Sequence, residues 1–151
     1  MPDIPSGIVI VCDGGCFHNQ NADKRQAYGS IAVFVNGQRK TMHYNGLDGA
    51  HETRQARIEF GPITNNQAEF RTVLVALGYV RELYGRSVEP APITIISDSE
   101  LVVNSALGIN KKFKVAEIAA LAGELKEKLA LLPLVKLEHR SREVVCAVLG
   151  H

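Results

Sequence analysis

Apolar positions in the first half of the chain occur in short runs that predict strands. The run GIVIVCDGGC is rich in β-branched residues and bounded by glycines, so we expect a strand over Ile8–Asp13. Gly29–Val35 and Gln38–Tyr44 flank the pair Asn36-Gly37, a strong signal for a two-residue turn between antiparallel strands. The polar stretch from Asn45 to about Arg57 is predicted to be a loop or a hairpin extension, and ARIEFGPI a further extended segment.

The spacing of apolar residues becomes helical after Ile63. One face of the predicted helix is marked by Phe70, Leu74, Leu77 and Tyr84. Thr64, Asn65 and Asn66 are candidate N-caps, and Gly85 is expected to end the helix.

The remaining pattern alternates strands and helices. PITIISDS predicts a strand, Ser99–Ala106 a short helix, and KVAEIAALAGELKEKLALL a helix that Pro133 ends. LVKLEH predicts the last strand, and SREVVCAVL a last helix between Ser141 and Gly150. This order indicates an α/β chain that starts with an antiparallel hairpin and continues with crossover units.

Composition narrows the class of protein. A chain of 151 residues suits a single domain, residues 1–151, and a net charge of +1 gives no global basic field, so nucleic-acid binding would need a local patch. No apolar run approaches the roughly 20 residues that span a bilayer, and the N-terminal sequence lacks a secretion signal. Cys12, Cys16 and Cys146 lack zinc-site spacing and are expected to be reduced thiols, which together with these features predicts a cytoplasmic protein.

Three acidic residues stand at places where the predicted elements converge. Asp13 and Asp98 each end a predicted strand, and Glu69 lies in the predicted first turn of the helix that leads into the strand before Asp98. If the two strands are parallel neighbours, all three carboxylates meet at one rim of the sheet. Their repulsion would be relieved by hard divalent cations such as Mg²⁺ or Mn²⁺, and two such ions can drive phosphodiester cleavage.

Each acid also has a purely structural explanation. Asp13 precedes two glycines and could be a turn residue, Asp98 precedes Ser99 and could cap a helix, and Glu69 could complement a helix dipole. The joint placement of the three favours a metal site.

The motifs CDGGCFHN, TNNQAEF and SDSELVVN, in this order, resemble the type 1 ribonuclease H family over nearly the whole chain. The resemblance implies a ribonuclease H-like fold, a five-stranded mixed sheet with its first three strands antiparallel and parallel strands added, flanked by helices on both faces. It implies cleavage of the RNA strand of RNA/DNA hybrids with two Mg²⁺ or Mn²⁺ ions, leaving a 5′-phosphate and a 3′-hydroxyl. The family's metal ligands fall on Asp13, Glu69 and Asp98, and its catalytic-loop histidine on His139.

The C-terminal segment departs from the family pattern. The position of the family's fourth carboxylate is Leu149, which cannot bind a metal. Three replacements are open: the imidazole of His151 as a fourth metal ligand, the terminal carboxylate of the same residue, or Glu143.

The expected contacts to nucleic acid lie near the same motifs. The resemblance assigns hybrid contacts to Asn65, Asn66 and the loop of Gly14, Gly15 and Cys16, and contacts to a phosphate of the DNA strand to Asn19 and Thr64. Lys111, Lys112 and Lys114 are expected to form a modest phosphate-binding patch.

Two functions fit these residues: an active hybrid-specific endonuclease, or a nucleic-acid-binding module whose catalysis is weakened by loss of the fourth carboxylate. An integrase or junction resolvase of the wider superfamily fits TNNQAE less well. The expected partner is an RNA/DNA hybrid, with no membrane and no obligate protein partner.

Overall fold

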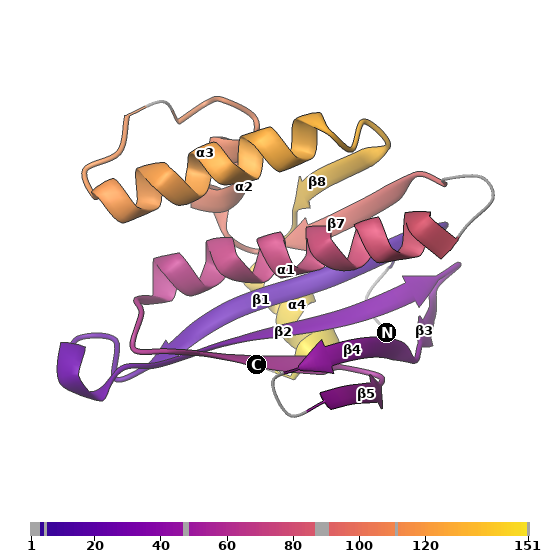
Figure 1. Cartoon of the computed structure of the whole chain (residues 1–151), viewed down its shortest axis with the longest axis horizontal. Helices are drawn as coiled ribbons and strands as arrows, with labels where there is room; N and C mark the ends of the chain where they lie inside the picture. The colour runs from indigo at the N-terminus through magenta and orange to yellow at the C-terminus, as the bar shows by residue number, and fades with distance from the viewer. Residues whose placement is uncertain (1–3, 5, 47–48, 87–90, 111, 151) are drawn as a thin grey trace.

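The structure is a computed structural model that describes residues 4, 6–46, 49–86, 91–110 and 112–150. The long strands β1 (Ile8–Phe17) and β2 (Gln26–Val35) pair antiparallel, and the 3-10 turn η1 (Ala22–Lys24) lies between them. β7 (Ile93–Ser97) and β8 (Val135–His139) add in parallel beside β1, so the main sheet has the order β3-β2-β1-β7-β8. The mixed five-position sheet predicted from the sequence is confirmed (Figure 1).

The edge position of the sheet beside β2 is shared by two short strands. β3 (Gln38–Lys40) pairs with the end of β2, and β6 (Ala56–Gly61) pairs with its beginning. Between them, β4 (Met42–Gly46) and β5 (Gly49–Thr53) pair with each other in a separate two-stranded sheet. The prediction of one strand over Gln38–Tyr44 is therefore wrong, because the chain leaves the sheet at Thr41. The hairpin extension expected after Asn45 is present.

Turn chemistry explains the connection from β2 to β3. Asn36 and Gly37 have φ values of 50° and 81°, the left-handed pair that a type I′ turn requires, as predicted. The Asn36 side chain also accepts a hydrogen bond of 2.8 Å from the N–H of Gly7, which fixes the turn against the start of β1.

The first strand is longer than predicted. β1 continues past Asp13 through Gly14 and Gly15, which pair with Gly29 and Tyr28 of β2. The glycines serve as strand residues at places of close approach: a Cβ at Gly14 would meet the backbone of α1 at Ala68, and a Cβ at Gly15 would meet the Tyr28 ring. Asp13 thus lies in the middle of β1 and not at its end.

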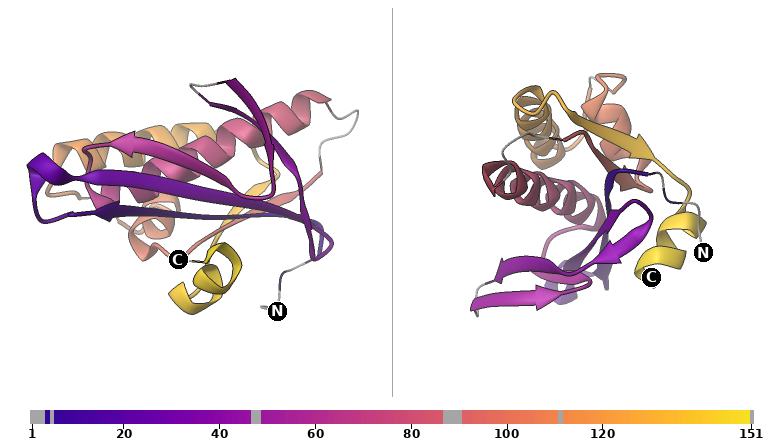
Figure 2. Two further views of the ribbon diagram at one scale, coloured as in Figure 1. Left: turned by 90° about the horizontal axis from the view of Figure 1, so that it is seen from below. Right: turned by 90° about the vertical axis from the view of Figure 1, so that its right-hand side faces the viewer.

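In the described part of the chain, four helices cover the two faces of the sheet unequally. α1 (Asn65–Arg86), α2 (Glu100–Ala106) and α3 (Ala116–Ala130) bury one face, and α4 (Arg142–Leu149) packs alone on the other (Figure 2, right). α1 runs one residue beyond Gly85, which therefore does not end it, whereas Ser141 caps α4 and Gly150 ends it at φ 83°, as predicted.

The two faces have separate apolar cores. On the three-helix side, Phe70, Leu77 and Leu125 are fully buried. On the α4 side, Val145, Val148 and Leu149 pack on a smaller cluster that includes Val9, Val11, Ala32, Phe34 and Ile96. Burying a side chain of this size contributes about 1.5–3 kcal/mol, so this single short helix is anchored firmly by its three apolar residues.

Candidate active site

Three carboxylates converge at the carboxyl end of β7. Asp13, Glu69 and Asp98 each offer an oxygen, and these oxygens lie within 4.8 Å of one another. The parallel register of β1 and β7 ends at Val11 opposite Ile96, so continuing it by two residues places Asp13 beside Asp98. β7 stops at Ser97, and the open edge of β1 beyond it is where the acids meet.

The structural explanations for these acids do not hold. Asp13 is part of a strand and not of a turn. Ser99, not Asp98, caps α2, because its side chain accepts a hydrogen bond of 3.2 Å from the N–H of Val102. Glu69 is the fifth residue of α1 and lies beyond the first turn, contrary to prediction, so its charge is poorly placed to stabilise the helix dipole.

Gly14 brings the strand and the helix together. A Cβ atom at this position would lie 2.5 Å from the carbonyl carbon and oxygen of Ala68 and 2.6 Å from the amide nitrogen of Glu69. These are backbone atoms that cannot move aside easily. The absence of a side chain at Gly14 therefore sets the distance between the two elements that carry Asp13 and Glu69.

Burial and mutual repulsion raise the proton affinity of the cluster. Burial, followed by the charge of Asp98 and a hydrogen bond with its carboxyl group, raises the pKa of Asp13 to about 7. Burial also raises the pKa of Glu69, against the effect of hydrogen bonds from Ser99 (2.8 Å) and Asn65. The pKa of the buried Cys12 thiol is raised too, so this thiol is inert and is no ligand.

The chemistry of these donors fits a hard divalent cation. Three carboxylate oxygens crowd one partly buried place, and their charges disfavour one another unless protons or a cation bind. Oxygen ligands of this kind suit Mg²⁺ or Mn²⁺.

The fourth carboxylate has no counterpart among residues 112–150. Leu149 is 4% exposed and belongs to the apolar core under α4. Glu143 is exposed in the first turn of α4 and is not part of the carboxylate cluster. His151 lies outside the described residues. The nearby charge of Arg142 lowers the pKa of both Asp13 and Glu69, a contribution that the sequence pattern did not reveal.

His139 is placed at the rim next to the cluster but is not part of it. It is the last residue of β8, is exposed, and pairs with Ser97, the residue before Asp98. Arg140 follows and donates its N–H to the carbonyl of Ser97 (3.0 Å), which holds the β8–α4 loop against the end of β7.

A polar pocket of about 480 Å³ lies at the start of α1. Thr64 and Gln67 form a capping box, in which the hydroxyl of Thr64 accepts from the N–H of Gln67 (3.2 Å) and the Gln67 side chain accepts from the N–H of Thr64 (2.8 Å). Asn19 accepts from the N–H of Asn65 (2.9 Å). Capping is thus done by Thr64, which leaves Asn66 exposed in the first turn and the Asn65 side chain directed to Glu69.

Arg25 is a second residue that the sequence pattern did not reveal. It lines the same pocket and donates from Nε to the carbonyl of Asn19 (2.9 Å). It has no motif around it, and the turn around η1 in the connection between β1 and β2 brings it back to Asn19, six residues earlier.

The other residues predicted to contact nucleic acid lie in two separate places, β1 and the loop between α2 and α3. Gly14, Gly15 and Cys16 belong to β1, and the Cys16 thiol donates to the carbonyl of Ile63 (3.3 Å). Lys112 and Lys114 are exposed in the loop between α2 and α3, whereas Lys111 lies outside the described residues. Phe113 packs against the core between the two lysines, which keeps their charges at the surface.

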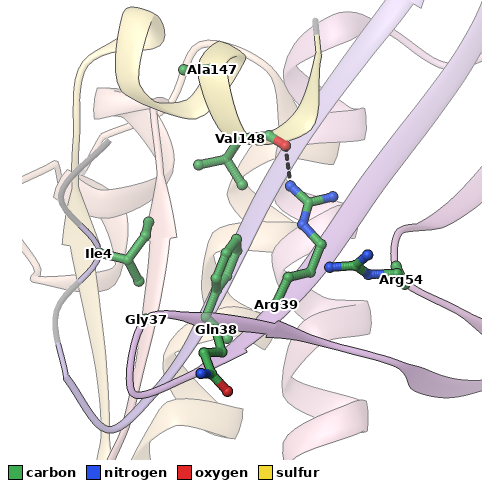
Figure 3. A pocket seen from close by; sticks show the side chains of 8 residues that line it. Ile4, Gly37, Gln38, Arg39, Arg54, Ala147 and Val148 are labelled. Atoms are coloured by element: carbon green, nitrogen blue, oxygen red, sulfur yellow. Dashed lines mark hydrogen bonds between the residues drawn. The ribbon is translucent and has the colours of Figure 1, made fainter. Parts of the chain in front are cut away.

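A second cavity, of about 440 Å³, lies behind α4 near the β2–β3 turn (Figure 3). Arg39 reaches across it to donate to the carbonyl of Val148, and its other nitrogen donates to Gln55 (3.2 Å). Gln55 in turn donates to the carbonyl of Leu149 (2.8 Å). These bonds satisfy carbonyls at the end of α4 that have no partner within the helix.

The family model described as RNase H matches residues 5–151. The chain belongs to the RNase H family. Among solved structures, it is similar to LC11-RNase H1 from a compost metagenome, with 21% identity, a TM-score of 0.71, and coverage of 95% of this chain and 90% of the other. RNase H1 from the archaeon Halobacterium salinarum shares 18% identity with a TM-score of 0.65, covering 93% and 89%.

LC11-RNase H1 has also been solved in complex with an RNA/DNA hybrid, and that structure matches with 22% identity and a TM-score of 0.58, covering 90% of this chain and 86% of the other. At these identities the likeness to RNase H structures shows the fold. No curated protein matches the chain by sequence. Within the described part of this RNase H chain, no helix combines the length and apolar character needed to cross a membrane.

Proposed function

We propose that this RNase H chain is an endonuclease that hydrolyses the RNA strand of RNA/DNA hybrids, leaving a 5′-phosphate and a 3′-hydroxyl. The observation that carries the proposal is the convergence of Asp13, Glu69 and Asp98 within 4.8 Å. Side chains from a strand, a helix and a loop that are far apart in sequence meet at a place where their charges oppose folding. A function that needs the cluster would explain it, and membership of the RNase H family supports nuclease activity as that function.

Asp13, Glu69 and Asp98 would hold two Mg²⁺ or Mn²⁺ ions, which activate water and stabilise the leaving oxygen when bound. Asp13 is the most buried of the three, and binding of an ion would displace the proton that its raised pKa of about 7 otherwise retains near neutral pH. The hydroxyl of Ser99 orients Glu69 by its hydrogen bond of 2.8 Å. Exposed His139, at the rim, would carry a proton to the leaving oxygen.

The hybrid would lie across the start of α1 and the segment Gly14–Cys16 of β1. Gly14, Gly15 and Cys16 would approach the strand, and Asn65 and Asn66 would reach sugars or base edges. Asn19 and Thr64 line a pocket to which Arg25 adds a positive charge, and this combination suits a phosphate of the DNA strand. Lys112 and Lys114, together with Lys111, would add salt-sensitive contacts to the backbone.

A second candidate function rests on the burial of Leu149. Since the family's fourth ligand position is an apolar core residue here, the chain would bind hybrids with weakened or lost catalysis unless His151 supplies the missing ligand. We propose His151 as that ligand, through its imidazole. Its replacement by alanine should then weaken Mn²⁺ binding measured by calorimetry, and unchanged affinity and turnover would remove it from the site.

The deciding experiment is cleavage of an end-labelled RNA/DNA hybrid in Mg²⁺ and, separately, in Mn²⁺, with double-stranded RNA and DNA as comparison substrates. The active form should cut only the RNA strand of the hybrid, and Asp13→Asn should abolish cutting. Asp23→Asn changes an exposed carboxylate outside the cluster and should leave the rate unchanged. Hybrid binding without cleavage in both metals would establish the binding module instead.

A further inference from the structure

The α4 face of the sheet is open beyond the carboxylate cluster. Side chains alternate along β1, so Asp13 and Phe17 point to the same face as Val9 and Val11, on which α4 packs. α4 covers only the earlier part of β1, and Figure 2 (left) shows β1 and β2 extending well beyond it. The exposed strip of sheet begins where the carboxylates end.

This strip carries a stack of three side chains. The rings of Phe17 and Tyr28 have centroids 5.2 Å apart and are inclined by 32°, and the guanidinium group of Arg57 lies 4.8 Å from the centroid of the Tyr28 ring. Gly15, opposite Tyr28, makes room for it, since a Cβ there would lie 2.5 Å from the phenol oxygen. Aromatic and cationic groups are thereby held in a fixed arrangement on the surface.

Much of the surface of Phe17 and Arg57 in this stack is exposed to solvent. Phe17 remains 49% exposed although it is a large apolar residue at the end of a strand. Arg57 pairs with Glu59 at 3.1 Å, but both side chains are more than half exposed, and such surface pairs stabilise a fold weakly. An aromatic platform with a guanidinium group beside it is the arrangement that proteins use to hold single-stranded nucleic acid.

We propose that the Phe17–Tyr28–Arg57 stack binds unpaired nucleotides that continue the RNA strand past the site of cleavage. This inference rests on the proposed function for the identity of the strand. Phe17 lies four residues beyond Asp13, which is about 13 Å along a strand. Successive phosphates of one strand advance by about 3.4 Å along a duplex, so the platform lies about four nucleotides from the phosphate at the carboxylates.

The substrate class that follows is a hybrid whose RNA strand extends beyond the paired region. A base that remains paired is stacked on its neighbours and cannot use the platform, whereas an unpaired base can. Stacking of one base on an aromatic side chain strengthens binding by about five-fold to about 150-fold. The platform would thus direct the enzyme to the ends of hybrids that carry unpaired RNA.

Binding in EDTA at low salt tests this without cleavage, using fluorescence anisotropy with labelled hybrids. The hybrids have blunt ends, an unpaired RNA extension at the 5′ or the 3′ end, or an unpaired DNA extension. We expect one of the RNA extensions to improve affinity at least five-fold over the blunt hybrid, and DNA extensions to have no effect. Equal affinity for all of them would overturn the proposal.

Three variants connect the preference to the stack. Phe17→Leu keeps an apolar side chain but removes the aromatic face, and should abolish the gain from the RNA extension without changing affinity for the blunt hybrid. Glu59→Gln removes the negative charge beside Arg57 and should increase the gain. Leu131→Ala, at another exposed apolar residue, should change neither. An undiminished preference in Phe17→Leu, or an equal loss for blunt and extended hybrids, would refute the assignment.

The outcome is separable from that of the proposed function. A preference for extended hybrids in a chain that cuts no hybrid in Mg²⁺ or Mn²⁺ would leave the platform in place and remove the nuclease. Cleavage without the preference would do the reverse.

Discussion

The strongest prediction concerns the stability of the metal-free protein. Asp13 is 6% exposed and shares its site with two other carboxylates, so its negative charge opposes folding. Asp13→Asn replaces the carboxylate with a neutral group of similar size. We expect the metal-free variant to be more stable than the wild type at pH 8, although a residue at the centre of the proposed chemistry has been changed.

The magnitude follows from the pKa of Asp13, which rises from the ordinary 3.8 to about 7 on folding. Between these values the folded chain holds a proton that the unfolded chain has released, so the free energy of unfolding falls as pH rises from about 4 to about 7. A shift of about three units corresponds to about 4 kcal/mol. For a domain of this size, that is about 8–16 °C in Tm, as an upper bound for the gain at pH 8.

The measurement is thermal unfolding in EDTA at pH 4.5 and at pH 8, for the wild type, Asp13→Asn and the exposed-site control Asp23→Asn. The first variant should gain stability at pH 8 and little at pH 4.5, where the wild-type carboxyl group is already protonated. The control should match the wild type at both. A gain that does not depend on pH, or no gain at pH 8, would show that the ionised carboxylate of Asp13 does not destabilise the folded state.

Three further predictions concern the same site. Gly14→Ala should lower Tm and nuclease activity together, because its Cβ would collide with the backbone of Ala68 at 2.5 Å, whereas Gly78→Ala, with nothing within 4 Å, should raise Tm slightly. Ser99→Ala should lower the free energy of unfolding by about 1 kcal/mol, because α2 loses its cap. It should also weaken Mg²⁺ binding in calorimetry, because Glu69 loses a hydrogen bond that lowers its pKa. Mg²⁺ at a hundred times its dissociation constant should stabilise the wild type by about 2.7 kcal/mol in thermal unfolding at pH 8, and no rise in Tm would mean that the folded chain holds no ion.

Local chemistry made much of the fold predictable. The turn at Asn36-Gly37, the cap at Ser141 and the stop at Gly150 each depend on residues adjacent in sequence, and the structure has all three as predicted. The end of β1 was predicted wrongly, because glycines usually interrupt a strand. Whether Gly14 does so depends on the helix that packs against it, which is distant in sequence.

In the candidate site, too, some residues could be predicted from local sequence and others could not. Asp13, Glu69 and Asp98 stand in motifs and could be named from the sequence, and their grouping followed from the order of strands and helices. Arg25 and Arg142 stand in no motif. Arg25 bonds the carbonyl of Asn19 within the connection between β1 and β2, and the charge of Arg142 reaches Asp13 and Glu69 from the first turn of α4. The division of the third strand at Thr41 was also hidden, because β3 and β4 read as one alternating segment.

The excursion through β4 and β5 has its two ends tied together by Arg39 and Gln55, which hydrogen-bond to each other and to the end of α4. A segment with joined ends adds little entropic cost when it grows, about 0.6 kcal/mol for each doubling of its length. Insertions into this hairpin are therefore expected to leave the carboxylate cluster undisturbed. Evolution could enlarge this hairpin, or an engineer could graft a recognition peptide there, while Asp13, Glu69 and Asp98 stay grouped.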